Sequence, residues 1–286
     1  YGWWGSMALG PHLLAGLGPP PPRSGTGRPV PRIPGAGGTR QTPAARAEDV
    51  TLKVGIMGGE DETVWAAVAE QAKPLGLVIE TGIFNDYTQP NEALANKEID
   101  ANAFQHFPYL EAQIAAHGYA LEPAFDTAIF PIGLYSRKYA GLDAPPDGAL
   151  IGVPHDPRHG GRALKVLEQL GLIKLNPEAG ILATVIDVTE NPRGFDLREL
   201  EAGVVGRAID DLDAAVVNTE WAAKAGLLDA RIAEESGENN PYMNFVAIRS
   251  EDKDAPWVAL LKQAFQSAPV KEAYLSAYKG AAVPAW

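Results

Sequence analysis

The sequence has 286 residues, of which 46% are hydrophobic, and it carries a formal net charge of −12 at pH 7. This length and apolar content are sufficient for one large domain or for two lobes. The acidic excess lies in residues 48–286 and argues against a nucleic acid as partner of this part. No apolar run approaches the roughly 18 residues that a membrane span needs, and the absence of cysteine excludes disulfides, thiolate chemistry and a lipid anchor attached through cysteine in this chain.

Residues 1–47 differ from the rest of the chain in composition. They contain nine prolines, ten glycines and five arginines but no acidic residue. Such a segment buries too little apolar surface to offset the entropy of ordering, so we expect a disordered leader or tag. The small-x-small sequence Ala45-Arg46-Ala47 fits the remnant of an export signal, and an expression tag or a start-site artefact is the alternative.

Strand and helix patterns alternate from Thr51 onwards. The first round is predicted to contain strands at Leu52–Met57, Leu77–Phe84, Asp100–Phe104 and Phe130–Tyr135, and helices at Glu60–Lys73, Asn91–Lys97 and Pro108–His117.

A second round of the same alternation follows and ends in two helices. Strands are predicted at Leu150–Val153, Thr184–Val188, Ala214–Val217 and Phe245–Ile248, and helices at Gly161–Leu170, around Glu199–Gly206, and at Thr219–Ala225, Ala255–Gln266 and Val270–Tyr278. Two successive βα sets predict an α/β chain with two parallel-sheet lobes. The natural ligand site in such a chain is the cleft between the lobes.

Aromatic and amide side chains are concentrated between Asn85 and Leu110. The aromatic residues are Tyr87, Phe104, His106, Phe107 and Tyr109, and the amides are Asn85, Gln89, Asn102 and Gln105. Rings provide rigid apolar walls, and amides donate and accept hydrogen bonds without charge, which suits a small ligand with one apolar and one polar end. The alternative is that these rings are core residues of an αβ layer.

The segment Val153–Arg162 follows a predicted strand and precedes a predicted helix. Its backbone amides can face an anion at the helix N-terminus, and Arg162 can add a bidentate guanidinium fork, so a carboxylate site is predicted here. A surface arginine on the first helical turn is the alternative. His155 and His159 are four residues apart, but the proline between them and the glycine that follows favour a loop, so no metal site is predicted.

Two asparagines lie at the ends of predicted strands. Asn218 follows Ala214–Val217 directly, and Asn244 precedes Phe245–Ile248. A neutral amide there can accept from an ammonium or donate to a carboxylate, although turn formation explains many such asparagines. No GxSxG, HExxH or GxxxxGK[ST] motif occurs, so we expect no catalytic residue and no cofactor, and we expect the protein not to be an enzyme.

Several longer motifs point to one family. The sequences NDYxxPNxAL, DANAFQHFPYL, VPxDPxxxGRAL, GLIKL, DVTENP, AVVNT and PYMNF occur in this order, followed by a terminal Trp286. Together they resemble the methionine-binding lipoproteins that feed bacterial methionine ABC importers, and the resemblance covers Leu52–Trp286.

The resemblance implies a two-lobed periplasmic binding protein of the Venus-flytrap type, type II-like, with a mixed sheet in each lobe. We expect residues 48–131 and 247–286 to form the first lobe and residues 132–246 the second. The strands that cross between them are expected to act as a hinge. The expected location is the periplasm or the outer face of the cytoplasmic membrane, and the expected partners of a monomer are an ABC permease and its ATPase.

The same resemblance implies roles for particular side chains. Arg162 is expected to bind the ligand carboxylate, and the other ligand-binding residues are expected to be Tyr87, Phe104, His106, Tyr109, His155, Asn218 and Asn244. L-methionine is the first expectation for the ligand. Histidines replace asparagines that the family usually carries before the arginine, which leaves D-methionine, a methionine-containing dipeptide or another apolar amino acid open. A ligand-sensing protein without a transport role is a further alternative.

Overall fold

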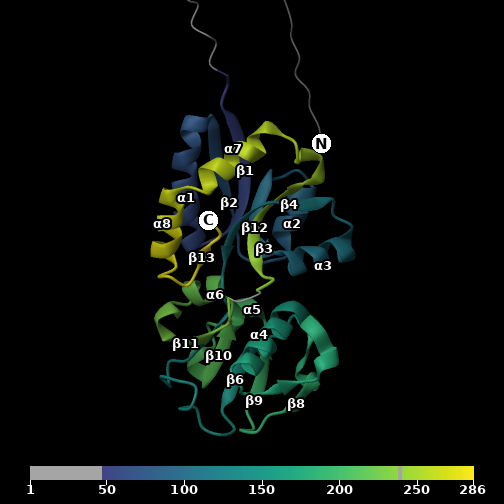
Figure 1. The fold of residues 1–286 in the computed structure, drawn as a ribbon, viewed down its shortest axis with the longest axis vertical. Helices are drawn as coiled ribbons and strands as arrows, with labels where there is room; N and C mark the ends of the chain where they lie inside the picture. The colour runs from purple at the N-terminus through teal and green to yellow at the C-terminus, as the bar shows by residue number, and fades with distance from the viewer. Residues whose placement is uncertain (1–46, 238–239) are drawn as a thin grey trace, which may run out of the picture. The chain divides into compact units, whose positions relative to one another are not determined.

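The computed structural model describes residues 47–237 and 240–286, and the expected leader lies outside the described residues except for Ala47 (Figure 1). The described chain forms two α/β lobes, each built on its own sheet. Both ends of the described chain contribute to the first lobe, as the purple and yellow segments of the ribbon in Figure 1 show. Within the described residues, no helix combines the length and the apolar character that a membrane crossing requires.

The first lobe contains a six-stranded mixed sheet. In spatial order its strands are β13 (Val283–Pro284), β4 (Leu121–Ile129), β12 (Met243–Arg249), β3 (Ala101–His106), β1 (Val50–Met57) and β2 (Leu77–Phe84). β1 runs parallel to β2 and β3, whereas β12 runs antiparallel to β3 and β4. The expectation of a purely parallel sheet was therefore wrong, and the mixed sheet that the family resemblance implied is confirmed.

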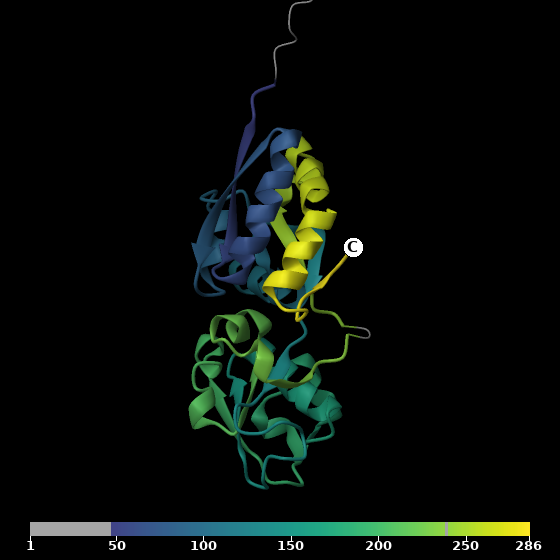
Figure 2. The same cartoon turned by 90° about the vertical axis from the view of Figure 1, so that its left-hand side faces the viewer.

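Alternating side chains of β12 pack against helices on the two opposite faces of this sheet. Val246 and Ile248 pack in a core cluster with α1 (Glu60–Ala72), α7 (Pro256–Phe265) and α8 (Ala268–Ala277), which lie together over one face (Figure 2). Phe245 and Ala247 pack in another cluster with α2 (Gln89–Ala95) and α3 (Phe107–His117). Because strand side chains alternate between faces, the two clusters lie on opposite sides of the sheet.

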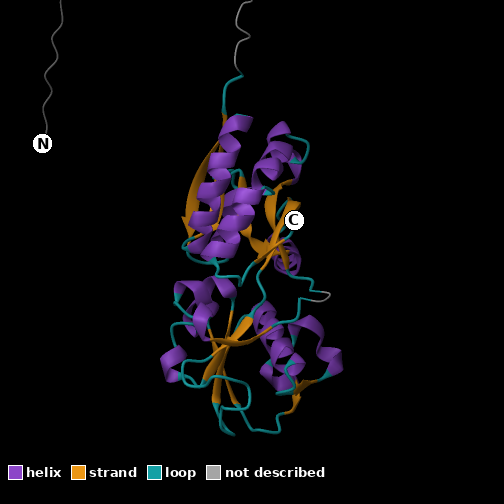
Figure 3. Ribbon diagram, turned by 60° about the vertical axis from the view of Figure 1, so that its left-hand side comes forward, coloured by secondary structure: helices purple, strands orange, loops and turns teal. Residues whose placement is uncertain are grey.

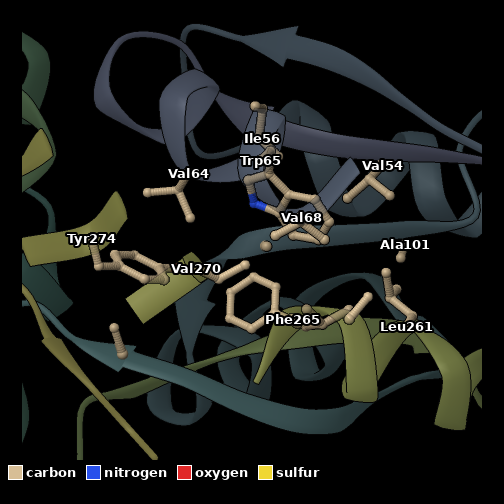
Figure 4. Packing of buried hydrophobic residues seen from close by; sticks show 14 of the residues in the cluster. Val54, Ile56, Val64, Trp65, Val68, Ala101, Leu261, Phe265, Val270 and Tyr274 are labelled. Carbon is tan, nitrogen blue, oxygen red and sulfur yellow. The ribbon is translucent and has the colours of Figure 1, made fainter. Parts of the chain in front are cut away.

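Aromatic packing joins the three helices of this layer to one another. The Trp65 ring lies 5.3 Å from the Phe265 ring, and Val270 and Tyr274 extend the same cluster (Figure 4). Trp65 and Phe265 are both almost completely buried. Rings of this size remove a large apolar area from water, so they are main contributors to the stability of this lobe.

The second lobe contains a five-stranded mixed sheet with helices on both faces (Figure 3). Its strands in spatial order are β11 (Arg231–Glu234), β5 (Gly133–Tyr135), β10 (Ala214–Val217), β6 (Leu150–Pro154) and β9 (Asp196–Leu200). The helices are α4 (Pro157–Gln169), α5 (Ala202–Val205) and α6 (Thr219–Lys224). A small antiparallel pair, β7 (Lys174–Leu175) and β8 (Val188–Glu190), lies apart from this sheet.

Short 3-10 helices connect these elements. They are η1 (Lys73–Leu75), η2 (Pro177–Leu182), η3 (Val185–Asp187), η4 (Ile209–Asp211), η5 (Leu228–Ala230) and η6 (Ser250–Asp252).

The chain passes between the two sheets twice. Residues 130–132 lead from β4 to β5, and residues 235–242 lead from β11 to β12. The predicted strand Phe130–Tyr135 is therefore wrong at its start, because only its last three residues pair in a sheet. The boundary expected between Val246 and Ala247 falls inside β12, so strand pairing favours a division before Met243.

A buried acid lies in the first turn of α1. Asp61 is 5% exposed and accepts a hydrogen bond of 2.5 Å from the Tyr278 hydroxyl. Burial raises the pKa of Asp61 from its usual 3.8 to about 7, although the bond from Tyr278 acts in the opposite direction. The unfolded acid ionises near pH 4, and the folded acid keeps its proton until about pH 7. Unfolding therefore releases a proton within this window, and stability falls as the pH rises through it.

The Asp61→Asn variant is expected to be more stable than the parent above pH 7, by up to about 4 kcal/mol at about 1.4 kcal/mol per pH unit. Asparagine has no charge to desolvate and can still accept the bond from Tyr278. Urea unfolding at pH 4 to 8 measures the difference, which should grow with pH. Exposed Asp254→Asn is the matched control. A difference that stays constant across the range contradicts the assignment.

Candidate functional site

One pocket is walled by side chains of both lobes. Its lining residues are Tyr87, Phe104, Gln105, His106, Tyr109, Phe130, His159, Arg162, Asn218, Glu220 and Asn244. The space between them amounts to about 340 Å³, part of which is open to solvent. A small ligand in this position contacts both lobes at once.

Aromatic rings form one wall of the pocket. Tyr87 lies between β2 and α2, and its ring centroid is 6.0 Å from that of Phe104 and 5.1 Å from that of His159. The Tyr109 hydroxyl donates a hydrogen bond of 2.7 Å to the Tyr87 carbonyl and fixes the loop that carries this ring. Trp221 of α6 approaches Tyr87 edge-on at 5.7 Å. The wall therefore combines rings from both lobes.

Helix α4 places a histidine and an arginine on the same face. Asp156 caps the helix by accepting the His159 backbone N–H at 2.9 Å, and Pro157 occupies the first helical turn. His159 and Arg162 are three residues apart within α4, a spacing that puts them on one side of a helix. The prediction that this segment is a loop was wrong, since a proline at the first helical position is compatible with a helix.

A glycine lets α4 approach β6 closely. A Cβ atom on Gly160 would lie 2.6 Å from the Pro154 carbonyl oxygen, which is too close for any side chain. The missing side chain thus brings the start of α4 against the end of the strand that precedes it.

Arg162 is held by a buried carboxylate. Its Nε donates to Glu235 Oε1 at 2.8 Å and its Nη2 to Glu235 Oε2 at 2.6 Å. Nη2 also donates to the Phe130 carbonyl at 3.0 Å, and the Tyr242 ring centroid lies 4.1 Å from the guanidinium carbon. Nη1 takes part in none of the hydrogen bonds between described residues. The Arg162 guanidinium is therefore fixed through Nε and Nη2, while Nη1 can donate to a ligand.

His106 offers a donor to the pocket. Its Nδ1 accepts the Tyr109 backbone N–H at 3.2 Å. Burial lowers the pKa of His106 well below its usual value, and the charge of Arg162 acts in the same direction. The ring is therefore neutral with its proton on Nε2. That nitrogen is buried and has no hydrogen-bond partner among the described residues.

Two asparagines supply amide groups at the same pocket. Asn218 precedes α6 in the capping position, but its side chain does not cap the helix, and its buried Oδ1 has no partner in the described part of the chain. Asn244 lies in β12 opposite His106 of β3 and is 7% exposed. Buried polar atoms without partners are rare in folded proteins, so they point to a ligand that completes them.

Glu220 brings a carboxylate to the pocket. It lies in the first turn of α6, is 9% exposed and receives a long hydrogen bond of 3.5 Å from the Tyr87 hydroxyl. Burial raises the pKa of the Glu220 carboxyl, while its own backbone amide and the charges of Arg162 and His159 act in the opposite direction.

The structure brings together every predicted site residue except His155. The His155 side chain is exposed and borders outer hollows instead, because α4 begins two residues later and turns His159 into the pocket. The sequence reasoning missed Glu220 and Glu235, which read as surface charges. The amides of Asn102 and Gln105, which were considered as polar groups for a ligand, bond to each other and to Asn91, although Gln105 also lines the pocket.

The arrangement is suited to holding a zwitterion with an apolar tail. Donors from His106, Arg162 and Asn244, together with acceptors from Asn218 and Glu220, surround a space with an aromatic wall. Among residues 47–237 and 240–286, no cluster of three or more histidine, aspartate or glutamate side chains has a geometry for a metal ion.

Comparison with known proteins identifies the family. A model of the NlpA lipoprotein family matches residues 52–286, which include both lobes and the whole pocket. The chain belongs to the NlpA lipoprotein family.

Relatives of this NlpA-family chain include well-described proteins. The D-methionine-binding lipoprotein MetQ of Escherichia coli K12 is 43% identical over 240 residues, which cover 82% of this chain and 88% of that protein. Among solved structures, a nutrient-binding protein from Burkholderia cenocepacia bound to methionine is 44% identical with a TM-score of 0.78, over 82% of this chain and 100% of that one.

An ABC transporter periplasmic substrate-binding protein from Coxiella burnetii is 38% identical with a TM-score of 0.77, over 82% and 100% of the two chains. The expected fold class, a two-lobed periplasmic binding protein, is thereby confirmed.

The Glu235→Gln variant is expected to lose on the order of 3 kcal/mol of unfolding free energy, because it leaves Arg162 buried without a counter-charge. Glu234→Gln is the matched control: the Glu234 carboxylate is exposed, so solvent weakens its pair with the half-buried Arg231, and the loss should stay below about 1 kcal/mol. Urea unfolding at pH 7 compares the two. Similar losses for both variants contradict a special role of the buried pair.

Proposed function

We propose that this NlpA-family chain is an extracytoplasmic solute-binding protein that captures methionine, with the L-enantiomer preferred, in its interlobe pocket and delivers it to an ABC importer. The observation that carries the proposal is the presence of two buried polar atoms without partners, His106 Nε2 and Asn218 Oδ1, beside an aromatic wall. The charged head of an amino acid satisfies both atoms, and a thioether lies well against ring edges, at about 0.3 to 1.5 kcal/mol per contact.

The hydrogen-bond donors of the pocket suit the carboxylate of an amino acid, and its acceptors suit the ammonium. His106 Nε2–H, Arg162 Nη1 and the Asn244 amide are available to the ligand carboxylate, and Asn218 Oδ1 is available to its ammonium. A charge-assisted hydrogen bond in such a site contributes about 1.5 to 3 kcal/mol. Tyr87, Phe104 and Tyr109 are left for the side chain of the ligand.

The role in transport is inferred from the pocket lining, which comes from both lobes. A ligand that contacts both lobes stabilises the closed conformation. A permease that recognises the closed conformation therefore binds ligand-loaded protein in preference to ligand-free protein. The importer's own ATPase supplies the energy. The protein works as a monomer in the periplasm or at the outer face of the cytoplasmic membrane, binding its ligand without chemical turnover and without a cofactor. The names of its relatives, a D-methionine-binding lipoprotein, a nutrient-binding protein bound to methionine and a periplasmic substrate-binding protein of an ABC transporter, support methionine binding and an extracytoplasmic role.

A second candidate ligand is a methionine-containing dipeptide. A larger hollow of about 1180 Å³, which is partly open to solvent, adjoins the pocket and shares Tyr87, Tyr109 and His159 with it, and exposed His155 borders this hollow. A ligand longer than one residue can extend past these rings into the hollow. D-methionine is the other alternative, since it carries the same functional groups in the opposite configuration at Cα.

Native mass spectrometry of freshly purified protein is expected to find methionine bound. After unfolding and refolding to remove it, isothermal titration should give tight binding of L-methionine, with weaker binding of D-methionine and of a methionyl dipeptide. A correctly folded parent that binds none of these ligands contradicts the proposal. A dipeptide that binds more tightly than L-methionine selects the second candidate.

The Asn244→Ala variant is expected to weaken L-methionine binding at least tenfold, which corresponds to about 1.4 kcal/mol. The substitution removes an amide that reaches the pocket from β12, while the strand pairing through backbone atoms remains. Asn96→Ala, at the exposed end of α2, is the matched control and should bind like the parent. Parent-like binding by Asn244→Ala shows that this amide does not contact the ligand.

A further inference from the structure

Glu220 is a buried carboxylate without a cationic partner. None of the ion pairs between described residues includes it, and the Tyr87 hydroxyl at 3.5 Å is a distant donor. Its side chain lines the pocket and is 9% exposed. An ionised carboxylate in such a place is unfavourable unless a cation or several donors compensate it.

The neighbouring basic side chains are engaged elsewhere. Arg162 makes a bidentate pair with Glu235, His159 Nδ1 lies 2.8 Å from Asp156 Oδ1, and Lys224 lies 4.6 Å from the centroid of the Trp221 ring. Because Arg162 and Glu235 cancel each other's charge, ionisation of Glu220 leaves excess negative charge in the pocket, and burial opposes this ionisation unless a positive group lies beside it. The consequence is a site that favours a ligand carrying a positive group.

A second acceptor lies two residues before Glu220. Asn218 Oδ1 is buried, has no partner among the described residues and lines the same pocket. A protonated amine has three N–H donors and no acceptor, so a carboxylate and an amide oxygen together match it well. A hydroxyl or an acylated nitrogen carries no positive charge and offers at most one donor.

We propose that Glu220 is the charged acceptor for the α-ammonium group of the ligand, and that it makes the pocket selective for amino acids whose amino group is free. This inference rests on the proposed function and adds a specificity-determining residue to it. α-Hydroxy acids and N-acylated amino acids are rejected because they leave the Glu220 carboxylate buried without its counter-charge.

The test is a cycle of two ligands and two proteins. The ligands are L-methionine and its α-hydroxy analogue, 2-hydroxy-4-(methylthio)butanoate, and the proteins are the refolded parent and the Glu220→Gln variant. Glutamine keeps the size and an amide oxygen but removes the charge. Glu201→Gln, which removes an exposed carboxylate outside the pocket lining, is the control.

The parent is expected to prefer L-methionine over the hydroxy analogue by about 10- to 150-fold, the range that a charge-assisted bond provides. Glu220→Gln should weaken L-methionine binding and leave binding of the analogue as strong as in the parent or stronger, because no charge is then buried without a partner, so that the preference disappears. Glu201→Gln should keep the parent's preference.

Three results overturn the inference. They are equal affinities of the parent for both ligands, parent-like L-methionine binding by Glu220→Gln, and an equal loss for both ligands in that variant, which indicates a role in pocket shape alone. The first comparison uses the parent alone and does not depend on the variant folding. A folded parent that binds no form of methionine overturns the proposed function, and the inference falls with it.

Discussion

The buried pair of Arg162 and Glu235 is the interaction on which the arrangement of the pocket depends. Arg162 comes from α4, Glu235 from the passage between β11 and β12, and the carbonyl of Phe130 from the passage between β4 and β5. Glu235 also accepts the Ile132 backbone N–H at 3.1 Å. One ionic contact therefore ties a helix of the second lobe to both segments that join the lobes.

The geometry of this pair has a consequence for recognition. A buried ion pair gains little stability overall, because desolvation offsets much of its attraction, but its orientation is strongly fixed when hydrogen bonds satisfy both partners. Here the Glu235 carboxylate accepts hydrogen bonds from Nε and Nη2 of Arg162, and Nη1 remains available to a ligand. The site thus contains a cation whose position is set before any ligand arrives, which reduces the ordering that binding requires.

The sequence predicted the βα alternation, the lobes and most of the pocket because these features depend on local pattern and on long motifs. It failed where local pattern and tertiary context disagree. Pro157 was interpreted as a loop residue, although it begins α4, and the predicted site contained His155 but not His159. β4 contains Pro123, and β9 has the highly charged sequence DLREL, so neither shows the apolar alternation typical of a strand.

The acidic residues of the site were missed for a different reason. Glu220 and Glu235 look like ordinary surface charges, and only the folded chain brings Glu235 next to an arginine 73 positions away. Nothing in the spacing of these residues indicates that either is buried. Charge pairing over such separations is a property of the tertiary structure, and a single sequence contains no local signal for it.

Trp221 lies where it can report the lobe movement that the proposed function requires. Its indole belongs to the second lobe and lies 5.7 Å from the Tyr87 ring of the first, while its Nε1 is buried without a partner among the described residues. Separation of the lobes exposes this indole to water and removes the phenol beside it, and both changes alter indole emission. Trp221 is therefore an intrinsic fluorophore at the contact between the lobes. Its emission can be used to follow the rate of lobe opening and closing without an attached dye.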